Sequence, residues 1–376
     1  MSGDDKLIQR ILLTTDCVGG VWNYTIQLAS ELAARGYQVL IAAIGPIPAE
    51  CHLHDLHLDG IRFEHSDYRL EWMDGGCDDL EILREWLLKL EAEFRPDVIH
   101  LNSYALADAP FAAPVLVVAH SCVYSWWHAV HGVLPPTRWS AYQRNVAAGL
   151  RSATAVVAPT HTMLRSLANN YGIRLFDGHV IPNGNTAVPT VNILAKRHKI
   201  LAAGRLWDES KNYSILDEVA LHLDWPIDIA GSTESPKGNS AFSGRSVNLL
   251  GALSQPALHR LMAEAAVFVH PALYEPFGLA ILEAANRGCA LVLADIPSLR
   301  ELWDNAALFC SPRDPSAWIT TLQAVSSDED LRSDLACRAL ARAAQYSTDR
   351  MLACYQDLYR RMTLNWNRAT QWVQAS

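Results

Sequence analysis

Two glutamates eight residues apart, Glu275 and Glu283, are the residues in this sequence best placed to do chemistry. They flank a Pro-Phe-Gly turn, and a helix is predicted from Leu279 to Asn286, with Gly288 just beyond its end. A carboxylate accepts two hydrogen bonds, so each glutamate could hold a pair of sugar hydroxyls. At about 1.5 Å of rise per residue, the two carboxylates would stand roughly 12 Å apart.

The turn between the glutamates predicts an anion site. The backbone N–H groups of Phe277, Gly278 and Leu279 are expected to be unpaired at a helix N-terminus, where the helix dipole favours an anion such as phosphate. A nucleotide sugar fits, because it has hydroxyls at both ends and phosphates between them. The alternative is one acid favoured by the dipole and one ordinary exposed glutamate, and the spacing alone does not decide.

Two cations are expected near the same kind of anion. Arg205 and Lys211 lie between a predicted strand at 199–203 and a predicted helix at 213–223. A glycine, an arginine and a lysine in such a connection could surround a phosphate group. A solvated surface pair is the alternative.

The first half of the chain offers its own candidate ligand residues. Gly19 and Gly20 stand between a strand at 10–15 and a helix at 22–35, where a ligand could approach the backbone closely. Their spacing is not that of a dinucleotide motif, no Walker lysine follows, and a tight turn without a ligand is the alternative. His120 follows a strand at 115–119, at the carboxyl end where open parallel sheets bind ligands.

An aromatic segment follows His120. Tyr124, Trp126, Trp127 and His128 could supply stacking faces and polar atoms for an acceptor. The alternative is an amphipathic helix that buries Trp126 and Trp127 in the core.

Two stretches contain residue types that bind metals but lack the other features of a metal site. His52, His54 and His57 alternate with leucine as a half-buried surface segment would, and no carboxylate or cysteine pair completes a site. The acidic run 328–330 stands at the start of a predicted helix, where acids favour the dipole. We therefore expect no metal and no cofactor.

Composition narrows the class of protein. The chain has 376 residues, half of them hydrophobic, with no apolar run near the roughly 20 residues that span a bilayer. The N-terminus has no apolar signal region, and the eight cysteines form no C-x-x-C pair. A net charge of −9 argues against nucleic acid as a partner. We expect a cytoplasmic protein, and the sequence allows a peripheral contact with the inner face of a membrane.

The alternation of strands and helices predicts two Rossmann-like α/β/α domains facing a central cleft. The expected divisions are an acceptor-side domain at 1–185, a linker at 186–198, a nucleotide-sugar domain at 199–345, and a helical tail at 346–376 that crosses back to the first domain.

The chain resembles the retaining glycosyltransferases of family four, which share the GT-B fold. The most specific part is YEPFGLAILEA, which matches the E-x7-E motif of that family with Glu275 and Glu283. GRLWDESKN, the glycine loop, His120 and the IPNG turn at 181–184 also match, so the likeness runs nearly end to end.

The resemblance implies a role for each matched residue. Arg205 and Lys211 would bind the donor diphosphate, Glu275 would meet the sugar, and Glu283 would hold the ribose. The acceptor would attack the sugar on the same face from which the phosphate leaves, without a metal. His120 would contact the sugar or the phosphate. DIPSLRELW departs from the family, where many relatives have a glycine-rich turn before the residue matching Glu301.

The function expected is therefore transfer of a hexosyl group from a nucleoside-diphosphate sugar to an acceptor that is a glycan, a lipid-linked molecule or a small molecule. A sugar-nucleotide epimerase of the same fold and a non-catalytic binding subunit are the alternatives. The sequence does not identify the sugar, the nucleotide, the acceptor or the oligomeric state.

Overall fold

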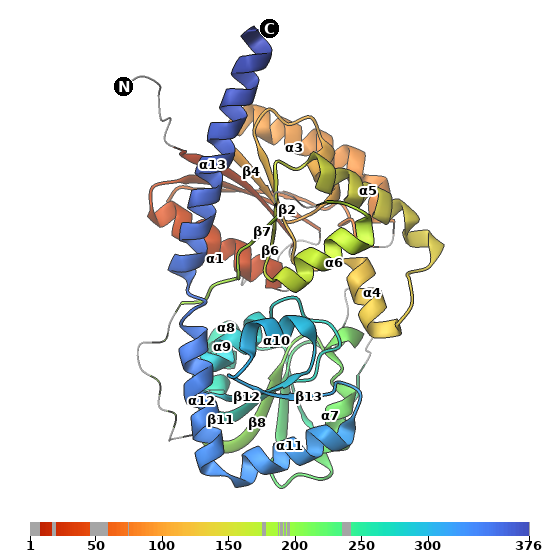
Figure 1. The fold of residues 1–376 in the computed structure, drawn as a ribbon, viewed down its shortest axis with the longest axis vertical. Helices are drawn as coiled ribbons and strands as arrows, with labels where there is room; N and C mark the ends of the chain where they lie inside the picture. The colour runs from red at the N-terminus through yellow and green to blue at the C-terminus, as the bar shows by residue number, and fades with distance from the viewer. Residues whose placement is uncertain are drawn as a thin grey trace. The chain divides into compact units, whose positions relative to one another are not determined.

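The computed structural model describes residues 8–16, 20–45, 59–73, 75–174, 178–186, 188, 191, 193, 196–234 and 242–375. The chain forms two compact units (Figure 1). Unit 1 comprises Met1–Ser125, Leu134–Pro182 and Thr348–Ser376, and unit 2 comprises Trp126–Val133 and Asn183–Ser347. The histidines at 52, 54 and 57, together with Gly19, lie outside the described residues.

Unit 1 is built on a seven-stranded parallel sheet. Its strands are β1 (Arg10–Asp16), β2 (Gln38–Ile44), β3 (Ile61–Ser66), β4 (Val98–Leu101), β5 (Val115–Val118), β6 (Ala155–Ala158) and β7 (Gly178–Val180). Their order across the sheet is β3-β2-β1-β4-β5-β6-β7. The order reverses between β1 and β4, which makes this a doubly wound Rossmann-like sheet, a type in which ligands are expected at the carboxyl ends of the strands.

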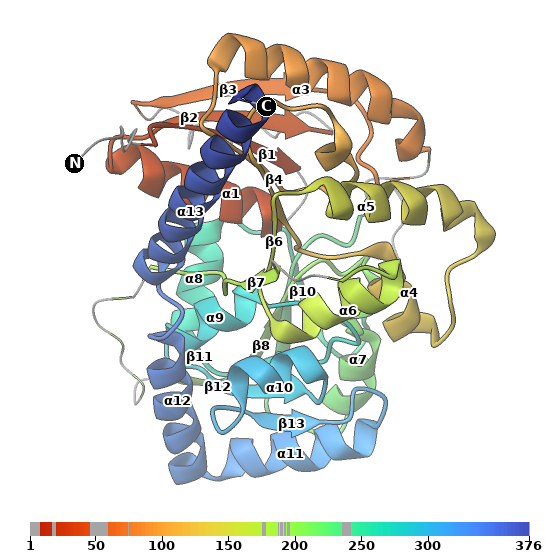
Figure 2. The same ribbon diagram turned by 45° about the horizontal axis from the view of Figure 1, so that its top comes forward.

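Helices cover both faces of this sheet. They are α1 (Gly20–Ala34), α3 (Leu80–Phe94), α5 (Ser140–Ser152), α6 (His161–Tyr171) and α13 (Thr348–Ala375), with short turns η2 (Gly76–Asp79), η3 (Ala105–Asp108) and η4 (Thr137–Trp139). Helix α4 (Val123–His131) begins in unit 1 and continues into unit 2. The long helix α13 runs beside α1 in both ribbon views (Figures 1 and 2).

The alternation of side chains along each strand explains why both faces are buried. Leu12 of β1 packs in one core with α3, α5 and α6, whereas its neighbours Ile11 and Leu13 pack in another with α1 and α13. Successive strand residues point to opposite faces, so strands with two apolar faces need helices on both sides. The tail from Thr348 onward supplies one of these helices.

Unit 2 repeats the plan with six parallel strands. They are β8 (Arg197–Ala203), β9 (Ile227–Ala230), β10 (Asn248–Gly251), β11 (Ala265–His270), β12 (Ala290–Ala294) and β13 (Leu308–Cys310), in the order β10-β9-β8-β11-β12-β13. The helices are α7 (Ser214–Ala220), α8 (Gln255–Glu264), α9 (Leu279–Ala285), α10 (Pro297–Trp303), α11 (Pro315–Ser327) and α12 (Glu329–Ala343), and η5 (Glu209–Lys211) is a short turn. The order reverses between β8 and β11, so these two strand ends are the expected ligand position.

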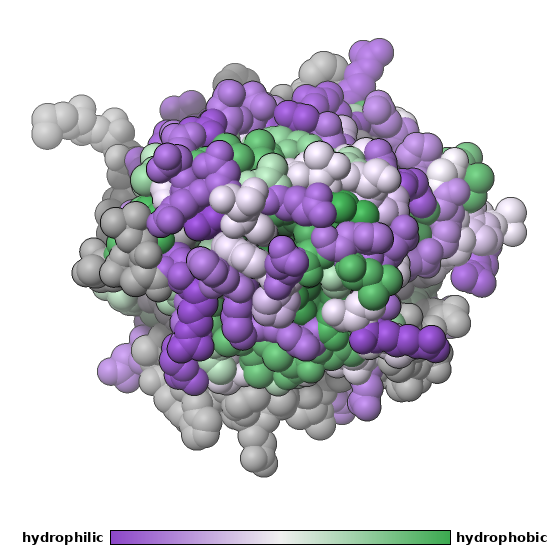
Figure 3. Space-filling model, turned by 90° about the horizontal axis from the view of Figure 1, so that it is seen from below, coloured by the Kyte–Doolittle hydropathy of each residue, from purple (hydrophilic) through white to green (hydrophobic). Residues whose placement is uncertain are grey.

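Among the residues that the structure describes, no helix combines the length and the apolar character needed to span a bilayer. Hydrophilic side chains cover much of the face in Figure 3, with smaller hydrophobic patches between them.

Candidate functional site

The site in unit 2 is formed by two loops at the switch point of its sheet. One follows β8 and carries Arg205 and Lys211, and the other follows β11 and carries Glu275. Backbone and side-chain hydrogen bonds join the two loops. The N–H of Leu273 donates to the Ser210 carbonyl at 2.7 Å, and the Asn212 amide donates to the Pro271 carbonyl at 3.0 Å. Residues 64 positions apart in sequence are thereby held together.

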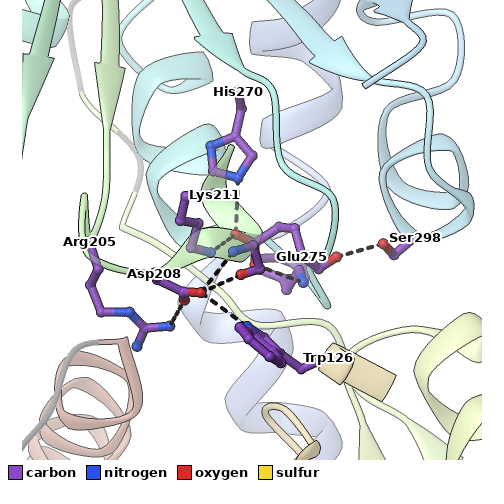
Figure 4. A network of polar contacts seen from close by, with 9 residues as sticks. Trp126, Arg205, Asp208, Lys211, His270, Glu275 and Ser298 are labelled. Atoms are coloured by element: carbon purple, nitrogen blue, oxygen red, sulfur yellow. Dashed lines mark hydrogen bonds and ion pairs between the residues drawn. The ribbon is translucent and has the colours of Figure 1, made fainter. Parts of the chain in front are cut away.

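Glu275 is the centre of a buried cluster (Figure 4). The Lys211 Nζ lies 2.7 Å from its Oε2, and the His270 Nε2 donates to the same oxygen at 3.1 Å. The Phe277 N–H donates to Oε1 at 3.4 Å. The Lys211 and Glu275 side chains are each 12% exposed. Burial raises the pKa of Glu275, but the Lys211 charge and the His270 hydrogen bond outweigh it, so this pKa lies well below its ordinary value. Glu275 is therefore a carboxylate at neutral pH.

Arg205 belongs to a second cluster centred on Asp208. The Arg205 guanidinium donates to Oδ2 of Asp208 at 2.8 Å, and the Trp126 indole N–H donates to Oδ1 at 3.0 Å. The Ser210 hydroxyl also donates to Oδ1, at 2.6 Å. Burial raises the pKa of Asp208, but the charges of Lys211 and Arg205 lower it by more, so the pKa lies below its ordinary value. Each cation of the site therefore has a carboxylate partner.

The turn before α9 differs in part from the prediction. The Phe277 N–H was expected to be unpaired, but it donates to Glu275, because the glutamate side chain folds back over its own loop. Within the described residues, the N–H groups of Gly278 and Leu279 have no partner. Gly278 has φ +88°, and a Cβ there would lie 2.6 Å from the Ile281 side chain. Only glycine fits this turn without strain.

Glu283 lies in different surroundings from Glu275. It is buried on α9, and its Oε1 faces the Gln255 amide at 3.4 Å and the His259 Nε2 at 3.7 Å, both from α8. Both distances are long for strong bonds, so the carboxylate retains capacity to accept hydrogen bonds from a ligand.

In unit 1, His120 lies at the carboxyl end of β5, as predicted, and is partly exposed. Its Nε2 contacts the Asn102 Oδ1 at 2.8 Å, and its ring packs on Tyr24 with centroids 4.6 Å apart. Burial lowers the pKa of His120 to about 4, so the ring is neutral at pH 7. Gly20 is the exposed first residue of α1.

The aromatic segment divides between the two units. Tyr124 is buried and packs against Tyr171 in unit 1. Trp126 and Trp127 belong to unit 2, and His128 is exposed. The Trp127 and His131 rings contact each other in a tilted arrangement, with centroids 4.6 Å apart. The structure thus brings Trp126 to the cations, whereas it places Tyr124 in a core.

The described residues contain no group of three or more His, Cys, Asp or Glu side chains placed to hold a metal. Asp328, from the acidic run, caps α12 by accepting the Leu331 N–H at 2.9 Å.

Family models cover both units. The model of Glycosyltransferase Family 4 matches residues 18–185, and the model of Glycosyl transferases group 1 matches residues 197–328. The chain belongs to glycosyltransferase family 4. It is therefore an enzyme, a hexosyltransferase, and activity with a sugar-nucleotide donor is the function that these matches support.

Relatives of this glycosyltransferase make different products. It is 25% identical to the glycogen synthase of Mycobacterium tuberculosis, over 87% of this chain and 86% of that protein. It is 36% identical to the O-antigen chain mannosyltransferase B of Escherichia coli over 101 residues, which are 27% of this chain and 26% of that protein.

Solved structures show the same fold. Sucrose-phosphate synthase from Thermosynechococcus elongatus superposes with a TM-score of 0.77 at 18% identity, over 95% of this chain and 100% of that one. Anabaena HepE in complex with UDP and glucose superposes with a TM-score of 0.71 at 18% identity, over 93% of this chain and 99% of that one. The predicted GT-B fold is confirmed.

Sequence reasoning missed three residues of this glycosyltransferase. Asp208 accepts a hydrogen bond from Arg205, and His270 donates one to Glu275. The Ser298 hydroxyl donates to the Glu275 carbonyl at 2.5 Å. His270 is the last residue of the buried strand β11, and His120 lies just beyond the end of β5, so position near a strand end is a signal that could have found His270. Asp208 stands between the two predicted cations and could have been found by its charge.

Proposed function

We propose that this hexosyltransferase takes its sugar from a nucleoside-diphosphate sugar, retains the anomeric configuration and needs no metal. The observation that carries the proposal is the contact of Lys211 with Glu275 beside the Arg205–Asp208 pair, at the switch point of a Rossmann sheet. Anabaena HepE has been solved with UDP-glucose, which supports the choice of donor class.

The two cations would neutralise the leaving diphosphate. A phosphate group entering beside Lys211 and Arg205 replaces or joins their carboxylate partners, and the N–H groups of Gly278 and Leu279 add donors. Groups fixed before the reaction stabilise developing charge without a reorganisation cost. Helix α9 has only seven residues, so we assign the effect to its individual N–H groups and not to a long dipole.

Glu275 would orient the sugar and would not attack it. Lys211 at 2.7 Å and His270 at 3.1 Å both bind Oε2, which ties the carboxylate to its own unit, and Oε1 has a longer contact of 3.4 Å with the Phe277 N–H. A double displacement needs a carboxylate free to bond to the anomeric carbon. We propose instead that the bond from C1 to the phosphate oxygen breaks as the acceptor oxygen bonds to C1 on the same face. The acceptor proton passes to the leaving phosphate oxygen.

Glu283 would bind the ribose. Its weak contacts with Gln255 and His259 leave room for two hydroxyl donors. The family resemblance also assigns His120 and Gly20, both in unit 1, to the donor.

The acceptor side of the enzyme carries an unusual charge distribution. Residues 109–176 contain none of the 40 acidic residues of the chain, although an even distribution would place about seven there. They contain five arginines, so this segment carries +5 and the remainder carries −14. Within the described residues, Arg144 and Arg151 form no ion pair and line one pocket between α5 and α6.

The same segment includes an exposed apolar loop. Val133 is 58% exposed and Leu134 is 74% exposed, and two prolines follow them. A segment that carries both arginines and exposed aliphatic residues suits an anionic bilayer, where phosphates meet the charges and acyl chains meet the apolar residues. We therefore propose that this segment contacts an anionic membrane surface.

Vesicle sedimentation tests the membrane contact. The enzyme should bind phosphatidylglycerol vesicles but not phosphatidylcholine vesicles, and both Arg144→Gln with Arg151→Gln and Val133→Ser with Leu134→Ser should weaken binding. Arg338→Gln with Arg361→Gln is the control with the same charge change. Equal binding by all variants, or no binding to anionic vesicles, would remove the proposal.

A donor panel tests the catalytic proposal. Incubation with UDP-, GDP- and ADP-sugars should release nucleoside diphosphate slowly from one of them, by transfer to water or to an added acceptor. A new sugar isomer without nucleotide release would indicate an epimerase, and binding without either product would indicate a non-catalytic subunit.

A further inference from the structure

We infer that Asn102 is a positioning residue that fixes one tautomer of His120, so that His120 meets the donor as a hydrogen-bond acceptor for a sugar hydroxyl. The inference rests on the proposed function, because it specifies which part of the donor His120 binds. Asn102 follows β4 and His120 follows β5, at neighbouring strand ends of unit 1.

The orientation of the Asn102 amide is set by its partners. Its Nδ2 lies 2.6 Å from the Thr14 carbonyl oxygen, which can only accept a hydrogen bond, and 3.1 Å from the Thr25 hydroxyl. Its backbone N–H donates to the Thr14 hydroxyl at 2.8 Å. A flipped amide would place two oxygens together at 2.6 Å, so the NH₂ group must face Thr14.

The fixed amide determines the proton position on His120. With the NH₂ group toward Thr14, Oδ1 of Asn102 faces the His120 Nε2 at 2.8 Å. An amide oxygen only accepts, so Nε2 carries the hydrogen and donates it. Because the ring is neutral, Nδ1 is then a bare lone pair. Within the described residues, the protein supplies no donor to Nδ1.

A lone pair at Nδ1 restricts what His120 can bind. The oxygens of a diphosphate at neutral pH are acceptors, and two acceptors repel each other. A sugar hydroxyl can donate to Nδ1 and still accept from another group. His120 therefore contributes to recognition of the sugar, and the diphosphate is left to Lys211, Arg205 and backbone N–H groups.

Nuclear magnetic resonance of the free enzyme tests the tautomer without any substrate. Long-range ¹H–¹⁵N correlation spectra of the full-length protein distinguish the Nε2–H from the Nδ1–H form, and His120→Gln identifies the His120 signals. We expect the Nε2–H pattern at pH 7. In Asn102→Leu that pattern should weaken or change, whereas Thr25→Val, which leaves the Thr14 contact intact, should retain it. An Nδ1–H pattern or a doubly protonated ring in the unaltered enzyme would overturn the inference.

Kinetics with the donor found in the panel test the consequence. Asn102→Leu should lower kcat/KM for the nucleotide sugar about tenfold or more, while affinity for the free nucleoside diphosphate stays within about twofold. A parallel fall in both would mean that His120 donates to the diphosphate, and the inference would be wrong. Failure of the unaltered enzyme to bind any nucleotide sugar would instead contradict the proposed function, and the spectrum of His120 would still report on Asn102.

Discussion

Replacement of Glu275 by glutamine separates sugar recognition from nucleotide binding. The substitution keeps the size of the side chain but removes the charge that faces Lys211 at 2.7 Å. If Lys211 binds the donor as proposed, Glu275 and an incoming diphosphate would compete for the same ammonium group. Without the carboxylate, Lys211 has a full charge available for phosphate, so nucleoside diphosphate should bind as tightly as before or up to about tenfold more tightly, about 1.4 kcal/mol.

Transfer should respond in the opposite direction. A neutral amide binds sugar hydroxyls less strongly than a carboxylate, and it also alters the charge around the departing phosphate. Losses of about 100-fold or more in turnover, near 2.7 kcal/mol, are typical when one fixed electrostatic group of an active site is removed. Titration calorimetry with UDP, GDP and ADP measures the first effect, and nucleotide release measures the second.

Glu264→Gln is the matched control for this experiment. Glu264 lies in the same unit, is 42% exposed at its side chain, and pairs with Arg197 at 3.0 Å. This variant should change neither binding nor turnover appreciably. If Glu275→Gln lost affinity and turnover by the same factor, Glu275 would be serving the nucleotide or the fold, and its assignment to the sugar would fail.

Three other predictions concern stability and binding. Lys211→Met should weaken nucleoside diphosphate binding at least about tenfold and destabilise unit 2 by about 3 kcal/mol in urea unfolding, because it leaves a buried carboxylate with its cation removed. Trp126→Phe should lower the free energy of unfolding by about 1 kcal/mol, since Asp208 loses an indole donor. Burial raises the pKa of Glu71 to about 7, so the folded state binds more protons than the unfolded state between about pH 4.5 and 7. Stability should therefore fall as pH rises through that window, by up to about 3 kcal/mol, and Glu71→Gln should flatten the dependence.

Each of these has an outcome that contradicts it. Unchanged nucleotide affinity in Lys211→Met would mean that its ammonium does not reach the diphosphate. An unchanged free energy of unfolding in Trp126→Phe would show that the indole N–H adds nothing measurable through Asp208. A stability profile that rises between pH 5 and 7 would contradict the direction of the Glu71 pKa shift.

The fold followed from local patterns in the sequence. Short apolar strands alternating with helices predicted two parallel sheets, and glycines marked several helix ends, such as Gly36 with φ +86° and Gly288 with φ +74°. Helix α1 covers Gly20–Ala34, close to the range 22–35 that the sequence predicts. These features are readable because periodicity and capping depend on neighbours within a few residues.

The sequence predicted which residues form the candidate site but not which of them contact one another. The sequence by itself determined that Glu275, Lys211 and Arg205 stand at the ends of strands, because each follows a short apolar run. Only the tertiary structure decided that Lys211 faces Glu275, that Asp208 holds Arg205 and Trp126, and that the Phe277 N–H is occupied. These contacts join loops far apart in the chain, and they depend on strand order, which no pattern within one segment specifies.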